Sequence, residues 1–115
     1  MFQRLWIFLM AMLIAGCVHP SPTMHEKKIR VLIVDGFSNH DWRQTTALIR
    51  HILGACDQFD ISVSTAPEKA EDPGWDSWRP KFADYDVVIQ TCNDISHGPK
   101  WPEPVQKDLQ QRSGF

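Results

Sequence analysis

The 115-residue sequence has no large excess of charge of either sign and no long hydrophobic run. Its 12 Lys+Arg and 14 Asp+Glu give a formal net charge of -2, so the chain lacks the basic stripe that binds the phosphates of DNA or RNA. The longest apolar run has 11 residues, about half of the ~20 that a helix needs to cross a bilayer. From the charge balance we expect no nucleic-acid partner.

The motifs of several enzyme classes are also missing. The sequence contains no glycine-rich dinucleotide or phosphate loop, no GxSxG and no HExxH. It has three cysteines but no CxxC or Cys/His pattern of the zinc type. No metal site is predicted, and the catalytic residues and cofactors, if there are any, stay unknown.

The short apolar run lies near the N-terminus, at residues 5–15, behind a single arginine. This pattern is typical of a signal peptide. The run ends in Leu-Ile-Ala-Gly-Cys, which resembles a bacterial lipobox. It predicts that residues 1–16 are removed and that Cys17 carries acyl chains such as palmitate. Two or more such chains would anchor the protein firmly in a membrane. An ordinary secretory signal and an uncleaved anchor are the alternatives.

A lipidated Cys17 places the protein in the bacterial cell envelope, facing the periplasm or the exterior, with the membrane as a partner. Residues 17–27 contain two prolines and no apolar periodicity, so we expect a tether. An exported chain meets oxidising conditions, and Cys56 and Cys92 could form a disulfide. We favour two separate, mostly buried thiols, because sequence alone does not bring the two cysteines together.

The remainder alternates strand and helix patterns. Expected strands cover residues 29–34, 59–64 and 85–91, and expected helices cover 42–53 and 102–111. Asp41 precedes the first helix as a cap, with Gln44 three residues on. This order predicts an α/β fold with a parallel sheet and right-handed crossovers. Because no strand follows the last helix, we expect three strands of a truncated sheet.

Two stretches resemble the ThuA-like (trehalose utilisation) domain family. The residues that carry the resemblance are Gly36, His40, Trp42, Thr45 and Thr46 in the first stretch, and Trp101, Pro102, Val105, Gln106 and Leu109 in the second. The resemblance implies a flavodoxin-like α/β domain of the class I glutamine amidotransferase-like type, about twice this length, with residues 28–115 as its N-terminal part. Family members are linked to the metabolism of trehalose and other sugars.

Ligands of open α/β sheets bind at the carboxyl ends of strands where the strand order reverses. With strand order 2-1-3, residues 35–42 and 92–101 share one rim of the sheet. The candidate ligand-binding residues on this rim are Asp35, Asn39, His40, Trp42, Asn93, Asp94 and His97. Carboxylates and amides pair with hydroxyl groups, and indole rings cover the apolar faces of a pyranose.

The sequence thus predicts a small-molecule ligand, a sugar or modified sugar, that the domain binds or acts on. Acid–base work would need His40 within about 4 Å of a carboxylate. The alternative for Asp41 is that it caps its helix and has no other role. The alternative for Trp42 is that it packs in the core. A binding module without enzymatic activity and an inactive truncated fragment are the alternatives. Trp75 and Trp78 are expected to plug the flank of the sheet, with a substrate lid as the lesser alternative.

Overall fold

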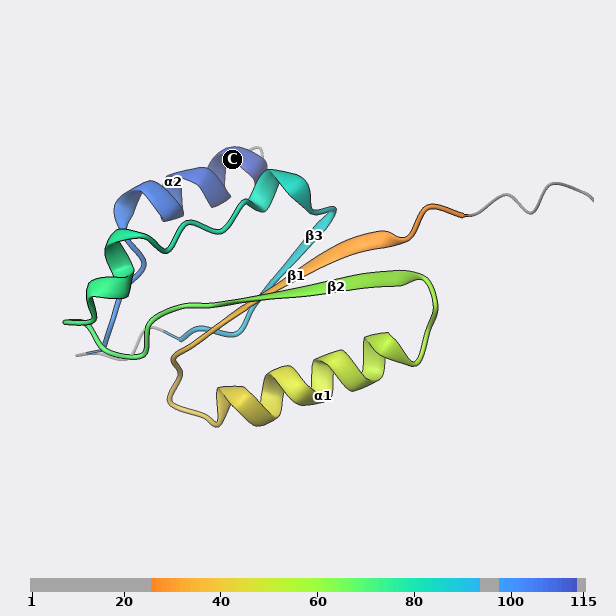
Figure 1. The fold of residues 1–115 in the computed structure, drawn as a ribbon, viewed down its shortest axis with the longest axis horizontal. Coiled ribbons are helices and arrows are strands. Elements are labelled where there is room, and N and C mark those ends of the chain that lie inside the picture. Colours follow the sequence, from red (N-terminus) through yellow and green to blue (C-terminus); the bar gives the residue numbers. More distant parts are fainter. Residues whose placement is uncertain (1–25, 94–97, 114–115) are drawn as a thin grey trace, which may run out of the picture.

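The computed structural model describes residues 26–93 and 98–113. Strands β1 (Ile29–Asp35), β2 (Phe59–Thr65) and β3 (Val87–Gln90) form a parallel sheet in the order β2-β1-β3. Helix α1 (Trp42–Gly54) lies on one side of this sheet, and α2 (Glu103–Ser113) lies on the other (Figure 1). The fold class, the strand order and the parallel pairing predicted from the sequence are confirmed.

The third strand is shorter than predicted. It begins at Val87 rather than at residue 85, because a 3-10 turn over Phe82–Asp84 ends with the Tyr85 N–H donating to the Phe82 carbonyl. The backbone N–H of Asp86 then donates to the Arg30 carbonyl at 2.8 Å. The predicted start of this strand is wrong, because Tyr85 has a side chain typical of strands but its backbone closes the preceding turn.

Strand β1 is the centre of the core, since β2 and β3 flank it. The side chains from Val31 to Val34 are at most 2% exposed. Leu32 and Val34 belong to a buried cluster with Phe82, Trp101 and Val105, and Val105 lies on α2. The continuous apolar run from Val31 to Val34 is therefore buried on both faces of the sheet, as its sequence predicts.

Helix α1 begins where the sequence places it, because the Asp41 carboxylate accepts a hydrogen bond from the Gln44 N–H at 3.1 Å. The buried face of α1 is narrower than the apolar pattern of its sequence predicts. Leu48 and Ile52 are 57% and 59% exposed, whereas Thr46 is buried. The apolar positions of α1 span a wider arc than its contact with β1 and β2 covers.

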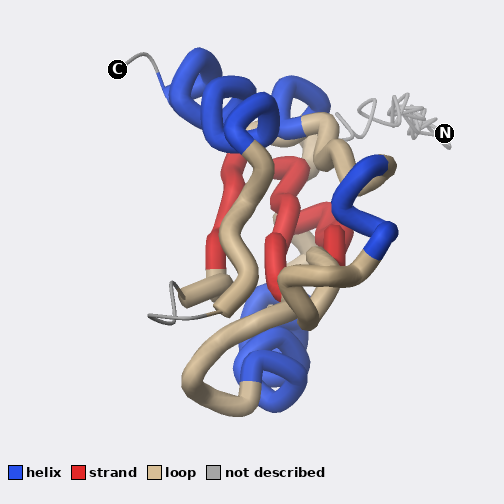
Figure 2. The backbone as a smooth tube through the Cα atoms, turned by 90° about the vertical axis from the view of Figure 1, so that its left-hand side faces the viewer, coloured by secondary structure: helices blue, strands red, loops and turns tan. Residues whose placement is uncertain are grey.

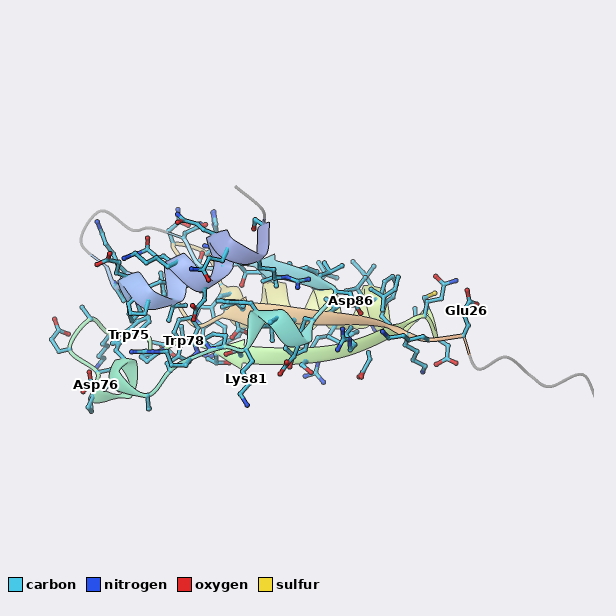
Figure 3. The ribbon with its side chains drawn as sticks, turned by 90° about the horizontal axis from the view of Figure 1, so that it is seen from above. Glu26, Trp75, Asp76, Trp78, Lys81 and Asp86 are labelled. Atoms are coloured by element: carbon cyan, nitrogen blue, oxygen red, sulfur yellow. The ribbon has the colours of Figure 1, made fainter. Side chains whose placement is uncertain are left out.

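The segment between β2 and β3 holds two tryptophans that pack against the buried cluster. Trp75 meets Phe37 edge-on at 6.0 Å between ring centroids, and Trp78 meets Trp101 at 5.4 Å. The indole N–H of Trp78 donates to the Ser64 hydroxyl at 3.1 Å. Figure 3 shows both rings at the end of the molecule opposite Glu26. These contacts agree with the predicted plug on the sheet's flank.

Residues 1–25, which include the predicted signal peptide and Cys17, lie outside the described part of the chain. Within residues 26–93 and 98–113, no helix combines the length and the apolar character needed to cross a bilayer.

Candidate functional site

The carboxyl ends of β1 and β3 lie side by side and carry the two loops that the sequence singles out. Val34 is in register with Gln90, and the Thr91 N–H donates to the Val34 carbonyl at 2.9 Å. Beyond the strands, the Asn93 side-chain amide donates to the Asn39 Oδ1 at 2.6 Å. Figure 2 looks at the molecule from this end. Two of the predicted site residues are thus in direct contact across the rim.

Gly36 lets the chain leave β1 in close contact with the segment that follows β2. Its φ is +129°, and a Cβ atom there would lie 2.1 Å from the Ala66 carbonyl oxygen. The Ala66 N–H donates to the Asp35 carbonyl at 2.7 Å, so the backbone on both sides is fixed. Only glycine fits this position, and this explains why the first loop of the site begins with it.

Asp35 is the last residue of β1 and lies beneath the rim. Its side chain is 1% exposed, and its Oδ2 accepts a hydrogen bond from the Thr46 hydroxyl of α1 at 2.7 Å. Its Oδ1 is buried and has no hydrogen-bond partner among the described residues. The sequence places Asp35 in an open loop, whereas the structure gives it a buried position that links β1 to α1.

The other candidates of the first loop are more open. His40 is exposed, and its backbone N–H donates to the Ser38 hydroxyl at 3.1 Å. No ion pair of His40 with a carboxylate occurs within the part of the chain that the structure describes. The Arg43 guanidinium lies 4.2 Å from the ring centroid of Trp42 and also pairs with Glu68. One face of Trp42 is therefore covered by a cation.

Asp94 and His97, the remaining candidates of the second loop, lie outside the described residues. Among the residues that are described, no group of three or more His, Cys, Asp and Glu side chains is arranged to hold a metal ion.

Next to the rim, a groove of about 510 Å³ opens between the loop after β3 and helix α2. We call it the amide groove, because three glutamines line it. Its lining residues are Phe37, Gln90, Cys92, Pro99, Lys100, Trp101, Gln106, Leu109 and Gln110. The sequence analysis did not find the glutamines. The signal that could have found two of them is the spacing of four residues that puts Gln106 and Gln110 on one face of α2.

Cys92 is a buried thiol that lines this groove. Burial raises the pKa of the Cys92 thiol, which donates a long hydrogen bond of 3.8 Å to the Val34 carbonyl. Cys56 is exposed, and neither cysteine is in a disulfide. The expectation that the two thiols are separate is confirmed, whereas the expectation that both are mostly buried is wrong for Cys56.

The geometry defines the class of the protein as a parallel α/β domain whose candidate site lies at the carboxyl ends of β1 and β3. Comparison with solved structures adds a particular likeness. The chain is similar to a protein described as thua-like from Parabacteroides merdae ATCC 43184, with 26% sequence identity and a TM-score of 0.65. The likeness covers 74% of this chain and 28% of that chain.

This likeness confirms the resemblance to ThuA-like domains that the two sequence stretches predict, and with it the glutamine amidotransferase-like α/β fold. The chain spans little more than a quarter of the length of that relative, at 28%. No family model matches the chain, and no curated protein matches it.

Proposed function

We propose that the protein is an envelope lipoprotein whose ThuA-like domain binds a sugar or modified sugar at the rim formed by the loops after β1 and β3. The observation that carries this proposal is the hydrogen bond between Asn93 and Asn39 at 2.6 Å. It joins the two loops, which are 54 residues apart in the sequence, into one surface.

The chemistry of this pair suits a ligand rich in hydroxyl groups. The Asn93 amide nitrogen donates to Asn39 Oδ1, so Asn93 Oδ1 and Asn39 Nδ2 are left as an acceptor and a donor. Adjacent hydroxyls of a pyranose offer the matching donor and acceptor. Both residues are exposed, so a ligand can reach them without displacing the core.

The position of the rim fits an anchor at Cys17. Strand β1 begins at Ile29, beside the tether, and the rim lies at its far end. Seven strand residues span about 20 Å, so the rim lies at the end of β1 away from the point where the tether joins it.

Enzymatic turnover of the bound sugar is the second candidate. The acid–base arrangement that an enzyme of this kind would need, His40 within about 4 Å of a carboxylate, is not formed among the described residues. Binding is therefore the function that the geometry supports best, and turnover of the sugar is a separate question.

The test is calorimetric titration of the full chain, purified in detergent, with trehalose and with glucose. Asn39→Ala removes the acceptor of the inter-loop bond and should weaken binding by about tenfold, the effect of one well-placed hydrogen bond. Gln58→Ala removes an exposed amide at the opposite end of the sheet and should leave binding unchanged. Equal affinities of these two variants would contradict the proposed rim.

A further inference from the structure

Two glutamines of the amide groove are held in place by the loop that follows β3. The Gln90 Nε2 donates to the Cys92 carbonyl at 3.2 Å, and the Gln106 Nε2 donates to the Trp101 carbonyl at 2.7 Å. The two amides come from different elements, a strand and a helix, yet both bind the same loop. Each amide uses a donor in this way and keeps its Oε1 as an acceptor.

Because the loop fixes both amides, their acceptor oxygens are oriented before any ligand arrives. Fixed acceptors are more useful to a binding site than mobile ones, since the entropy of ordering them is not lost on binding. Phe37 and Trp101 also line the groove, but they are only 6% and 8% exposed, so a small part of each side chain borders the polar acceptors.

We propose that the amide groove is the pocket that takes the sugar ring, with Gln90 and Gln106 as the acceptors that select ligand hydroxyls. This inference rests on the proposed function and goes beyond it, because it moves the ring from the outer rim into the groove. The Asn39–Asn93 pair then holds the part of the ligand that extends onto the rim.

The size and polarity of the groove favour this class of ligand. A volume of about 510 Å³ lies within the range of small-molecule pockets, roughly 300–1,000 Å³. A purely apolar ligand would cover the oxygens of Gln90 and Gln106 without offering them a donor, which is unfavourable. A polyhydroxylated ring can donate a hydrogen bond to each of these oxygens.

The first measurement compares trehalose and glucose binding by Gln106→Leu and Gln90→Leu in the full chain. Each variant should bind about tenfold more weakly, because each loses one acceptor. Gln111→Leu is the matched control, since Gln111 is exposed on the same helix and does not line the groove. Cyclohexanol, a ring with a single hydroxyl, should bind all four proteins weakly and alike.

The second measurement needs no variant and so does not depend on variant folding. In heteronuclear NMR spectra of the ¹⁵N-labelled full chain, saturating trehalose should shift the backbone amide of Cys92 and the side-chain amides of Gln90 and Gln106, with one common Kd.

If the chemical-shift changes are confined to Asn39 and His40 and both glutamine variants bind as the wild type does, the groove is not the binding pocket. The proposed function would then still stand. Absence of any binding of trehalose and glucose to the wild-type chain would refute both proposals.

Discussion

Replacing Gly36 by alanine should remove most of the stability of the domain. The added Cβ would lie 2.1 Å from the Ala66 carbonyl oxygen and 2.7 Å from the Ala66 nitrogen. Both contacts are with backbone, which cannot turn away as a flexible side chain can. Either β1 or the segment after β2 must move by close to 1 Å.

The size of the loss follows from two costs. A residue with a side chain held at a φ of +129° is strained by about 1–3 kcal/mol. The required shift also disrupts the hydrogen bond from the Ala66 N–H to the Asp35 carbonyl, which adds about 1 kcal/mol and exposes nearby buried groups. We expect a total loss of about 3–5 kcal/mol, against a total stability of about 5–15 kcal/mol for a typical domain.

Urea unfolding followed by tryptophan fluorescence measures this loss. With a slope of about 1 kcal/mol/M for a small domain, the midpoint should fall by about 3 M or more. Gly54→Ala is the control, because its Cβ would meet no atom within 4 Å and alanine suits a helix better by about 0.5–1 kcal/mol. A midpoint for Gly36→Ala within 0.5 M (roughly 0.5 kcal/mol) of the wild type would refute the reasoning.

Three further predictions concern other parts of the chain. Thr46→Val leaves the buried Asp35 carboxylate without its hydroxyl donor, so the melting temperature should fall by at least about 4 °C; an unchanged value would contradict the bond. Arg30 holds the pKa of the Asp86 carboxyl well below its ordinary 3.8, so the wild type should be more stable than Asp86→Asn at pH 7. This advantage should shrink as the pH falls below 3.8 and the carboxylate is protonated, and a difference in melting temperature that does not change with pH would oppose it. Cys17→Ser should abolish the uptake of labelled palmitate, and a wild-type chain that takes up none would refute the lipid anchor.

The order of strands and helices could be predicted because its signals are local. A largely apolar stretch rich in β-branched residues from Ile29 to Val34 predicts a strand, and Asp41 predicts the start of a helix. These local signals agree with one another. The parallel pairing followed from the alternation of strand and helix, and the order β2-β1-β3 followed from the flavodoxin-like fold that the family resemblance implies. The start of β3 escaped prediction, because a turn that ends at Tyr85 depends on a backbone hydrogen bond rather than on side-chain type.

The site was predicted only in outline. The two loops could be placed together from topology alone, and the contact of Asn39 with Asn93 follows from that placement. The burial of Asp35 could not be predicted, because it depends on how closely α1 approaches β1, where Thr46 meets the carboxylate. The glutamines of the groove were missed because their roles come from backbone carbonyls, which every residue has and no sequence motif marks.

The aromatic residues decide how rigid the proposed pocket is. Trp78 and Phe82 both contact the ring of Trp101, at 5.4 and 6.0 Å between ring centroids, and Trp101 is 8% exposed. Such pairs add roughly 0.5–1.5 kcal/mol each beyond burial, so the ring of Trp101 is held in place from the side of the core. The Trp101 carbonyl accepts the hydrogen bond that orients the Gln106 side chain. The core contacts that hold Trp101 in place therefore also restrain the Gln106 Oε1. The tryptophans that plug the flank of the sheet therefore also fix the geometry with which the groove would recognise a hydroxyl.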